Sequence, residues 1–379
     1  MPSVESIYNS IYRRVKTAYC KKRDFRTDRH IVVFESDDWG SIRMSSRKAW
    51  DCLRNMGYHV DERPYERYDI LESEEDVTAL AEVLLKFKDC KGNHPVITLN
   101  YLAANPDFEA IRKNGISEYC YESVENTYLK YPQNHHHVLE LVRKGINEGI
   151  FKPQCHGREH FNVLAWMRAL QACKQEVVDA FNYNMCGIAP MDNPQLGNRY
   201  MVAFESRSAE EQEYVCHAVE EGLVGFEQLW GFPSMSFVAP CYTWNESIES
   251  VLHNHCVQLI QTSRIQHLSD KKKDVYRYSG ETNKWHQYYS IRNCFFEPST
   301  SLSPENEVNS CFNSIKGAFE NHKIAVVSSH RINYVGGISE QNRKQTLSML
   351  DNLLLLVIDR FPDVEFLSSD ELIQMLKTR

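Results

Sequence analysis

The stretch "IVVFESDDWGSIR", residues 31–43, runs from continuous apolar residues into two adjacent carboxylates, Asp37 and Asp38. A short apolar run of this kind is typical of a β-strand that is covered on both faces, as in a parallel sheet flanked by helices. In such folds the carboxyl ends of the strands carry the functional side chains. The stretch therefore predicts an α/β protein with chemistry at Asp37 and Asp38, although either residue could instead cap a helix.

Seven further apolar runs alternate with helical patterns along the chain. They lie at 95–100, 150–155, 235–240, 257–263, 292–298, 323–329 and 364–369. Helical periodicity is clearest at 74–87 and 342–361, and Ser368 and Glu371 are spaced for a capping box before the last helix.

The alternation predicts a single distorted (β/α) barrel of seven or eight parallel strands with helical insertions. An open, doubly wound sheet is the alternative. The segments 101–149 and 161–234 are longer than a simple crossover. We expect them to be insertions over the active face or extra helices.

Charge is unevenly distributed over the 379 residues. The net charge is −8, yet residues 1–30 hold eight Lys or Arg against three acids, a net of +5, and the rest of the chain carries −13. We expect residues 1–29 to form a basic helix packed on a barrel of residues 30–379, through Ile7, Ile11, Val15 and Tyr19. Peripheral contact with an anionic membrane or an acidic partner is the alternative for this start. The acidic total argues against nucleic acid as a partner.

Several features concern the cellular compartment. No run of ~18 apolar residues predicts a membrane span, and the N-terminus lacks the pattern of a signal peptide. The twelve cysteines have no framework spacing and form no C-x-x-C pair. These features predict a cytoplasmic protein with reduced thiols.

Polar residues recur where the predicted strands end. His156 and His160 follow the third run, and His330 ends the seventh. Two imidazoles four residues apart on a helix reach one metal ion, and an aspartate completes three ligands with one position left open, as in catalytic zinc sites. Each histidine alone could be an ordinary helix or core residue. The histidines of "NHHH" (134–137) form a competing cluster, which we interpret as surface or loop residues.

Four motifs together resemble those of a known family, the polysaccharide deacetylases or NodB-homology carbohydrate esterases. They are "FESDDWG" (34–40), "CHGREH" (155–160), "APCYTWN" (239–245) and "VVSSH" (326–330). The resemblance covers the motifs from about residue 30 to 335. It implies a distorted β/α barrel that removes N- or O-linked acetyl groups from a carbohydrate, with metal-bound water as the nucleophile. The implied cofactor is a divalent metal, with zinc the first candidate.

The resemblance also implies roles for single residues. Asp37 falls on the general base, His330 on the general acid, and Asp38, His156 and His160 on the metal ligands. A backbone oxyanion donor falls near Cys241 and Tyr242. For substrate binding we expect the residues Trp39, Tyr242, Trp244 and Arg292, with Tyr334 as a further aromatic platform; core packing is an equal alternative for the aromatic residues.

The chain departs from the family pattern in three places. Trp39 separates Asp38 from Gly40, and Val238 stands where the family has an arginine that steadies the base. Arg292 or Arg264 could replace that arginine. The family's aspartate that orients the acid histidine has no clear match, and Glu297 is the candidate stand-in.

Two other functions stay open at this point. One is a catalytically inactive barrel that binds sugar, which Val238 favours. The other is a glycosidase of the same barrel superfamily, for which Glu35 or Glu297 would be the second carboxylate. No phosphate-binding loop motif occurs, so a phosphate-handling enzyme is not expected.

Overall fold

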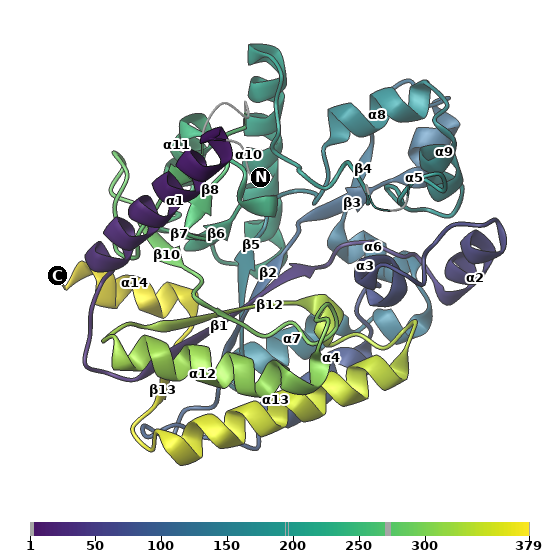
Figure 1. Cartoon of the computed structure of the whole chain (residues 1–379). Coiled ribbons are helices and arrows are strands. Elements are labelled where there is room, and N and C mark those ends of the chain that lie inside the picture. Colours follow the sequence, from purple (N-terminus) through teal and green to yellow (C-terminus); the bar gives the residue numbers. More distant parts are fainter. Residues whose placement is uncertain (1–3, 194, 196, 270–273, 379) are drawn as a thin grey trace.

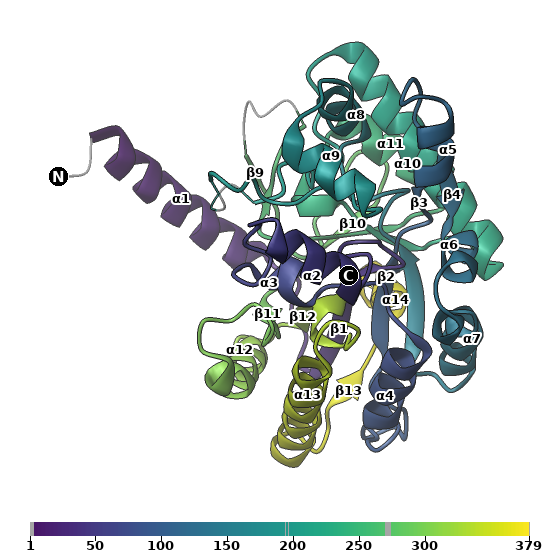
Figure 2. The same cartoon turned by 90° about the vertical axis from the view of Figure 1, so that its right-hand side faces the viewer.

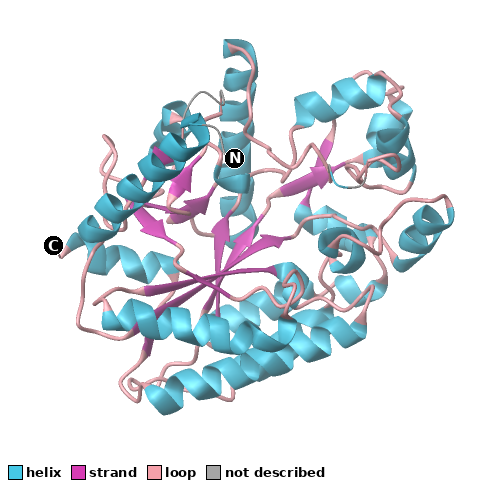
Figure 3. Ribbon diagram, viewed as in Figure 1, coloured by secondary structure: helices cyan, strands magenta, loops and turns pink. Residues whose placement is uncertain are grey.

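The computed structural model describes residues 4–193, 195, 197–269 and 274–378, with helices surrounding a central sheet (Figures 1 and 3). The parallel strands are β1 (Ile31–Trp39), β2 (Ile97–Tyr101), β5 (Phe151–Cys155), β6 (Ser236–Val238), β7 (Leu259–Thr262), β10 (Tyr288–Ile291), β11 (Cys294–Phe295), β12 (Ala325–His330) and β13 (Glu365–Phe366). Two antiparallel pairs lie outside this sheet: β3 (Ala104–Pro106) with β4 (Tyr121–Ser123), and β8 (Ile265–Gln266) with β9 (Val275–Tyr276).

Helices connect the strands along the chain. They are α1 (Val4–Arg23), α2 (Arg47–Asn55), α3 (Pro64–Tyr68), α4 (Glu74–Leu84), α5 (Phe108–Lys113), α6 (Val124–Lys130), α7 (Val138–Asn147), α8 (Val163–Gln171), α9 (Gln175–Asn182), α10 (Ala209–Trp230), α11 (Glu246–Asn254), α12 (Glu307–Glu320), α13 (Glu340–Arg360) and α14 (Ser369–Lys377). On the outside of the sheet α7, α4, α13 and α12 pack side by side in this order, and α10 packs beside α11.

The sheet is closed into a barrel by one continuous segment. The order of paired strands is β10-β7-β6-β5-β2-β1-β12-β11, and only Arg292 and Asn293 separate β10 from β11. The Arg292 N–H donates to Thr262 O of β7 (2.9 Å), whereas the Asn293 N–H donates to Val326 O of β12 (3.1 Å). The segment 288–295 therefore joins the two edges of the sheet, and seven strand positions complete the ring. We call this junction at Arg292 and Asn293 the seam.

The interior of the barrel changes from apolar to polar toward the carboxyl ends of the strands. Because side chains alternate along a strand, residues 31, 33, 35 and 37 of β1 face the same side. Ile31 and Val33 join an apolar cluster with Leu372 and Ile373, by which α14 covers the amino ends of the strands. Farther along, Glu35 and Asp37 meet polar residues from the other strands. The barrel thus holds its charged groups at the end where we expect the active site.

The predicted fold is confirmed. All eight apolar runs contain strands, although the last forms only β13, which pairs with the start of β1 outside the ring. The helices predicted at 74–87 and 342–361 correspond to α4 and α13, and the capping box of Ser368 and Glu371 is present at α14. The segments 101–149 and 161–234 hold the extra helices α5–α10.

The N-terminal segment forms a helix, as expected, but two of its predicted packing residues were wrong. Val15 and Tyr19 are 62% and 54% exposed, and Cys20 is the buried side chain instead. Ile7 and Ile11 lie outside the residues whose side chains are described. Figure 2 shows α1 extending away from the body of the molecule. None of the described helices has both the length and the apolar composition that a membrane crossing requires.

A buried ion network supports the loop after β1. Arg331, directly after β12, donates to Asp69 Oδ1 (2.8 Å), to Glu72 Oε2 (2.9 Å) and to the carbonyl of Ser41 (2.7 Å). Glu72 Oε1 in turn accepts from the N–H of Gly40 (2.9 Å). Arg331, Asp69 and Glu72 are fully buried. Their mutual pairing is what makes burial of these charges tolerable.

We expect Arg331→Met to lower the free energy of unfolding by about 3–5 kcal/mol, because Asp69 and Glu72 would stay buried without their cation. Urea denaturation measures this change. Lys316→Met is the control, since the Lys316–Glu320 pair is exposed and should contribute less than about 1 kcal/mol. Equal effects of the two substitutions would contradict the role given to Arg331.

Candidate metal and catalytic site

A local distortion of β1 brings two adjacent carboxylates to one site. Asp37 follows the strand alternation and faces the barrel interior, so a regular strand would turn Asp38 to the other side. Asp38 instead has φ +75°, and the pairing of β1 with β2 shifts register between Ser36 and Trp39. A residue other than glycine in this left-handed region is uncommon and points to a local functional constraint. The distortion brings Asp38 within 3.7 Å of His156 and 3.3 Å of His160, while Asp37 lies 3.9 Å from His330.

In the described part of the chain, only one group of three potential metal ligands lies close together. It consists of Asp38, His156 and His160, and all three are buried. Asp38 Oδ1 lies 3.3 Å from His160 Nε2 and 3.7 Å from His156 Nε2. Two ligand atoms bound ~2.0–2.1 Å from one tetrahedral ion are about 3.4 Å apart, so these separations fit a metal. Asp38 Oδ1 and His156 Nε2 are buried and have no hydrogen-bond partner among the described residues.

The surroundings hold the two histidines in the form that ligates a metal. His156 Nδ1 lies 2.8 Å from the carbonyl of Val238, which can only accept a hydrogen bond, so Nδ1–H is the donor and the Nε2 lone pair is left for an ion. Burial lowers the pKa of His160 to about 3, so its imidazole is neutral at neutral pH. A neutral imidazole is the ligand form.

Asp38 has a cationic partner that sequence reasoning missed. Burial opposes its ionisation, but the Arg43 guanidinium beside it holds the pKa of Asp38 well below its usual range. Arg43 Nη2 donates to Asp38 Oδ2 (3.1 Å), and its Nε lies 3.6 Å from Asp69 Oδ2. Arg43 therefore links the candidate metal ligand to the buried network of Arg331.

Asp37 is held by Arg292 through two parallel hydrogen bonds. Arg292 Nη1 donates to Oδ2 (2.6 Å) and Nη2 donates to Oδ1 (2.7 Å), and Asn100 Nδ2 adds a third bond to Oδ1 (2.8 Å). Burial alone would raise the pKa of Asp37, but Arg292 outweighs it and lowers the pKa far below its usual range. The Asp37 carboxylate is therefore ionised.

Of the two arginines offered as replacements at Val238, Arg292 is the one that contacts Asp37. Besides Asp37, it donates to Glu35 Oε2 (2.7 Å), to Gln261 Oε1 (2.9 Å) and to the hydroxyl of Tyr242 (3.2 Å). All five donors of a guanidinium suit such planar, bidentate contacts. The other candidate, Arg264, pairs with Asp24 instead (2.6 Å). Arg292 is fully buried by these contacts, so it holds Asp37 and does not face a substrate.

His330 is oriented by a carboxylate from the seam side of the barrel. Its Nδ1 lies 2.6 Å from Glu297 Oε1, and Asn333 Nδ2 donates to the other oxygen of Glu297 (2.9 Å). His330 Nε2 lies 3.9 Å from Asp37 Oδ2. Burial alone would lower the pKa of His330, but Glu297, Asp37 and Asp38 raise it to about 9. The imidazole is therefore protonated at neutral pH.

The aromatic residues predicted to bind substrate do not all reach the cleft. Trp39 and Trp244 are fully buried in the main hydrophobic core, where their indole nitrogens donate to Ser36 Oγ (2.9 Å) and Glu249 Oε1 (3.0 Å). Tyr334 is buried as well. These three residues pack in the core, which was the alternative interpretation. Their burial leaves no ring face for a sugar. Tyr242 remains partly exposed beside Arg292.

The backbone at Cys241 and Tyr242 reverses sharply after β6, with φ of +53° and +52°. The N–H of Tyr242 already donates to the carbonyl of Ala239 (2.9 Å), so it is not free for an oxyanion. Within the described residues no hydrogen bond is found for the N–H of Cys241. Of the two residues expected to carry the oxyanion donor, Cys241 is the one with an available N–H.

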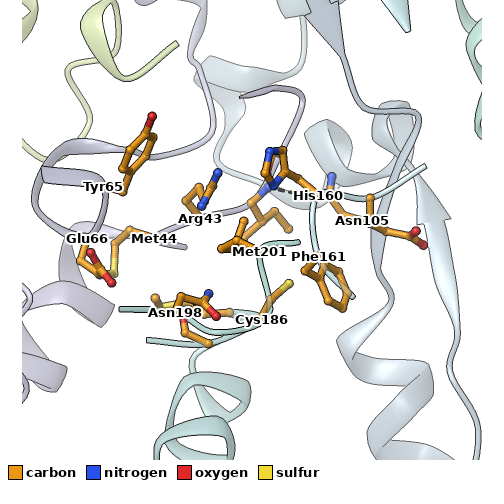
Figure 4. A pocket seen from close by; sticks show the side chains of 15 residues that line it. Arg43, Met44, Tyr65, Glu66, Asn105, His160, Phe161, Cys186, Asn198 and Met201 are labelled. Atoms are coloured by element: carbon orange, nitrogen blue, oxygen red, sulfur yellow. Dashed lines mark hydrogen bonds between the residues drawn. The ribbon is translucent and has the colours of Figure 1, made fainter. Parts of the chain in front are cut away.

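A pocket opens beside His160 (Figure 4). Its wall combines the loop after β1, α3, and residues of the insertion between α9 and α10, so part of the segment 161–234 lies over this face as expected. Tyr65 of α3 also reaches the site, since its ring lies edge-on to His330 (5.9 Å) and under the Arg43 guanidinium (5.1 Å). Tyr65 and Arg43 lie in loop-rich sequence, and no spacing rule singled them out.

The competing histidines of residues 134–137 do not form a metal site with the candidate ligands. His135 and His136 each lie within hydrogen-bond distance of a backbone carbonyl, and His137 pairs with Glu140 (3.1 Å). They belong to a short 3₁₀ turn (Gln133–His135) and the start of α7. His135 is buried, and His137 is exposed.

Comparison with known proteins finds similar structures but no similar sequence. No family model matches the chain, and no curated protein matches it in sequence. Solved structures of similar fold do exist. Polysaccharide deacetylases are among them.

Three of these structures illustrate the range. A protein described as a polysaccharide deacetylase from Mycobacterium smegmatis has 11% identity and TM-score 0.44, with 93% of this chain and 92% of that one covered. One described as a probable polysaccharide deacetylase from Pseudomonas aeruginosa PAO1 has 9% identity and TM-score 0.45, with coverage of 92% and 91%. BA3943 of Bacillus anthracis, described as a CE4 family pseudoenzyme, has 9% identity and TM-score 0.37, with coverage of 91% and 66%. Likenesses this distant carry no argument about activity, which rests on the residues of the site.

The loop that carries both histidines is fixed from outside by α10. A Cβ placed on Gly222 of α10 would lie 2.6 Å from the N of Arg158 and 2.8 Å from the carbonyl carbon of Gly157. Arg158 itself pairs with Glu159 (2.6 Å) and with Glu221 of α10. The helix therefore touches the backbone of the histidine loop directly, and any larger residue at 222 must displace that loop.

We expect Gly222→Ala to weaken zinc binding about tenfold or more, because losing a contact that positions metal ligands costs affinity on this scale. Isothermal titration with Zn²⁺ measures the change. Gly317→Ala on α12 is the matched control, since a Cβ there meets no atom within 4 Å. Unchanged zinc affinity in folded Gly222→Ala would contradict the role of this contact.

Proposed function

We propose that this chain is a divergent member of the polysaccharide deacetylase family. In this proposal it acts as a metal-dependent carbohydrate deacetylase that hydrolyses an N- or O-linked acetyl group. One observation carries the proposal: the buried group of Asp38, His156 and His160 lies beside an ionised Asp37 and a protonated His330. Three ligands with an open side, a proton acceptor and a proton donor form the set that metal-assisted hydrolysis needs.

The ligand set suits a divalent ion. Two imidazoles and one carboxylate favour zinc, although other divalent ions accept the same donors. A metal held there would supply Lewis acidity at the acyl carbonyl and make water acidic enough to attack near neutral pH. The orphaned atoms Asp38 Oδ1 and His156 Nε2 would gain their missing partner.

The protein's own groups divide the proton transfers between them. Asp37, kept ionised by Arg292, accepts the proton of the attacking water. His330, kept protonated by Glu297, donates a proton to the leaving amine or hydroxyl. The N–H of Cys241 is placed after β6 as the candidate donor to the developing oxyanion.

The two competing functions lose their main support. Val238 favoured an inactive barrel because the steadying arginine was missing, yet Arg292 supplies a guanidinium to Asp37. A glycosidase needs a second free carboxylate. Glu35 is committed to Arg292 and to Ser369 (2.7 Å), and Glu297 is committed to His330 and Asn333.

We expect Asp37→Asn to keep its metal and lose about 10²–10⁴ in kcat/KM, because it removes the proton acceptor while Arg292 stays paired with Glu35. His156→Ala should lose both metal and activity. Acetate release from acetylated chito- and xylo-oligosaccharides, with elemental analysis of each protein, measures the two effects. Exposed Asp51→Asn is the control and should behave as the parent. Full activity in Asp37→Asn would remove the assigned base, and a parent that binds zinc yet releases no acetate would favour the inactive barrel.

The pH dependence should follow His330. The donor must be protonated, so kcat/KM should hold below pH 9 and fall above it, because the pKa of His330 is about 9. Glu297→Gln removes the carboxylate that raises this pKa. We expect it to move the alkaline limb of the pH profile down by about 1–3 units. The pH profile of Glu305→Gln, a substitution at an exposed residue, should match that of the parent. If the alkaline limb does not move in Glu297→Gln, His330 is not the proton donor.

A further inference from the structure

The helix α1 turns an apolar face away from the protein to which it is attached. Among its described side chains, residues 12–23, only Cys20 is buried, at 3% exposure. Val15, five residues earlier, points about 140° around the helix from Cys20. Val15 and Tyr19 are largely exposed, whereas the ring of Tyr12 meets Tyr276 of β9 edge-on, with 6.3 Å between the ring centroids. An amphipathic helix normally buries its apolar stripe against the core, and here the stripe faces outward.

Basic residues border this exposed stripe. Residues 12–23 contain six Lys or Arg and no acid. Arg13 lies 4.0 Å from Asp274, and Arg23 Nη1 donates to the hydroxyl of Tyr19 (2.9 Å). In the described part of the chain, no acidic partner is found for Arg14, Lys16, Lys21 or Lys22. The helix therefore presents unneutralised positive charge next to exposed apolar and aromatic side chains.

We propose that α1 is an interfacial helix that lays the exposed face of Val15 and Tyr19 into an anionic lipid surface. An outward apolar stripe, aromatic rings and a basic border are the properties of helices that lie in the plane of a membrane interface. Each Lys or Arg near such a surface adds attraction to acidic headgroups. A second copy of the same helix would face six positive charges with six more, so charge disfavours self-pairing of α1 and favours an acidic surface.

Vesicle co-sedimentation of the full chain tests this surface. We expect binding to vesicles of phosphatidylcholine and phosphatidylserine (about 3:1) that weakens as salt is raised from about 0.05 to 0.5 M, and no binding to phosphatidylcholine alone. The double variant Val15→Ser/Tyr19→Ser should lower the partition coefficient about tenfold or more. Arg14→Gln/Lys16→Gln/Lys22→Gln should lower it by a similar factor and flatten the salt dependence. These residues lie outside the candidate catalytic site, so acetate release from soluble oligosaccharides should be unchanged.

A matched control separates the helix from the rest of the surface. Leu302→Ser/Lys316→Gln removes one exposed apolar and one exposed basic side chain elsewhere on the molecule and should bind vesicles as the parent does. Parent protein that ignores anionic vesicles, or Val15→Ser/Tyr19→Ser that binds them equally, overturns the proposal. A concentration-dependent dimer, seen by light scattering and lost in Val15→Ser/Tyr19→Ser without vesicle binding, assigns the face to a second copy and also overturns it.

Discussion

The pairing of one guanidinium with two carboxylates inside the barrel is the constraint on which the site depends. Arg292 contacts Glu35 and Asp37, two inward residues of the same strand, and it also marks the seam where the sheet closes. Removing Arg292 would leave two buried carboxylates without their cation, which costs several kcal/mol. The geometry of barrel closure and the ionisation of Asp37 are therefore set by the same side chain. A structural ion pair and the ionised state of the proposed base coincide at Arg292, so neither can change independently of the other.

Around this pair, each charged group of the site is held in its own protonation state by a different partner. Glu297 keeps His330 protonated, Arg292 keeps Asp37 ionised, and Arg43 keeps Asp38 ionised. Burial works against ionisation in all three cases and is outweighed each time by a specific partner. Opposite protonation states can therefore coexist at His330 and Asp37, although the imidazole and carboxylate lie 3.9 Å apart. A proton donor and a proton acceptor in one cleft require such separate partners.

Local patterns in the sequence predicted the strands and the chemistry at their ends, because buried parallel strands leave short apolar runs and functional residues follow them. Asp37, Asp38, His156, His160 and His330 were found this way and do converge. The sequence did not predict which side chains pair across the barrel. That Arg292 rather than Arg264 meets Asp37 depends on strand order, and Arg43 reaches Asp38 through the path of a loop. The sequence does not distinguish whether Trp39 and Trp244 bind a sugar or pack in the core. Elements distant in the chain decide whether such a side chain is buried. The predicted packing of Val15 and Tyr19 of α1 was wrong for the same reason.

The seam also limits how this chain can vary in length. Side chains alternate between the two faces of a strand, so one residue gained or lost between β10 and Asn293 would exchange inside and outside for everything beyond it. Arg292 would then point toward the helices and Asn293 toward the carboxylates. The long connection from β7 to β10 can absorb insertions without this effect, whereas the four residues of β10 cannot. Natural relatives of this barrel should therefore differ freely in that connection and keep a fixed count of residues at the closure.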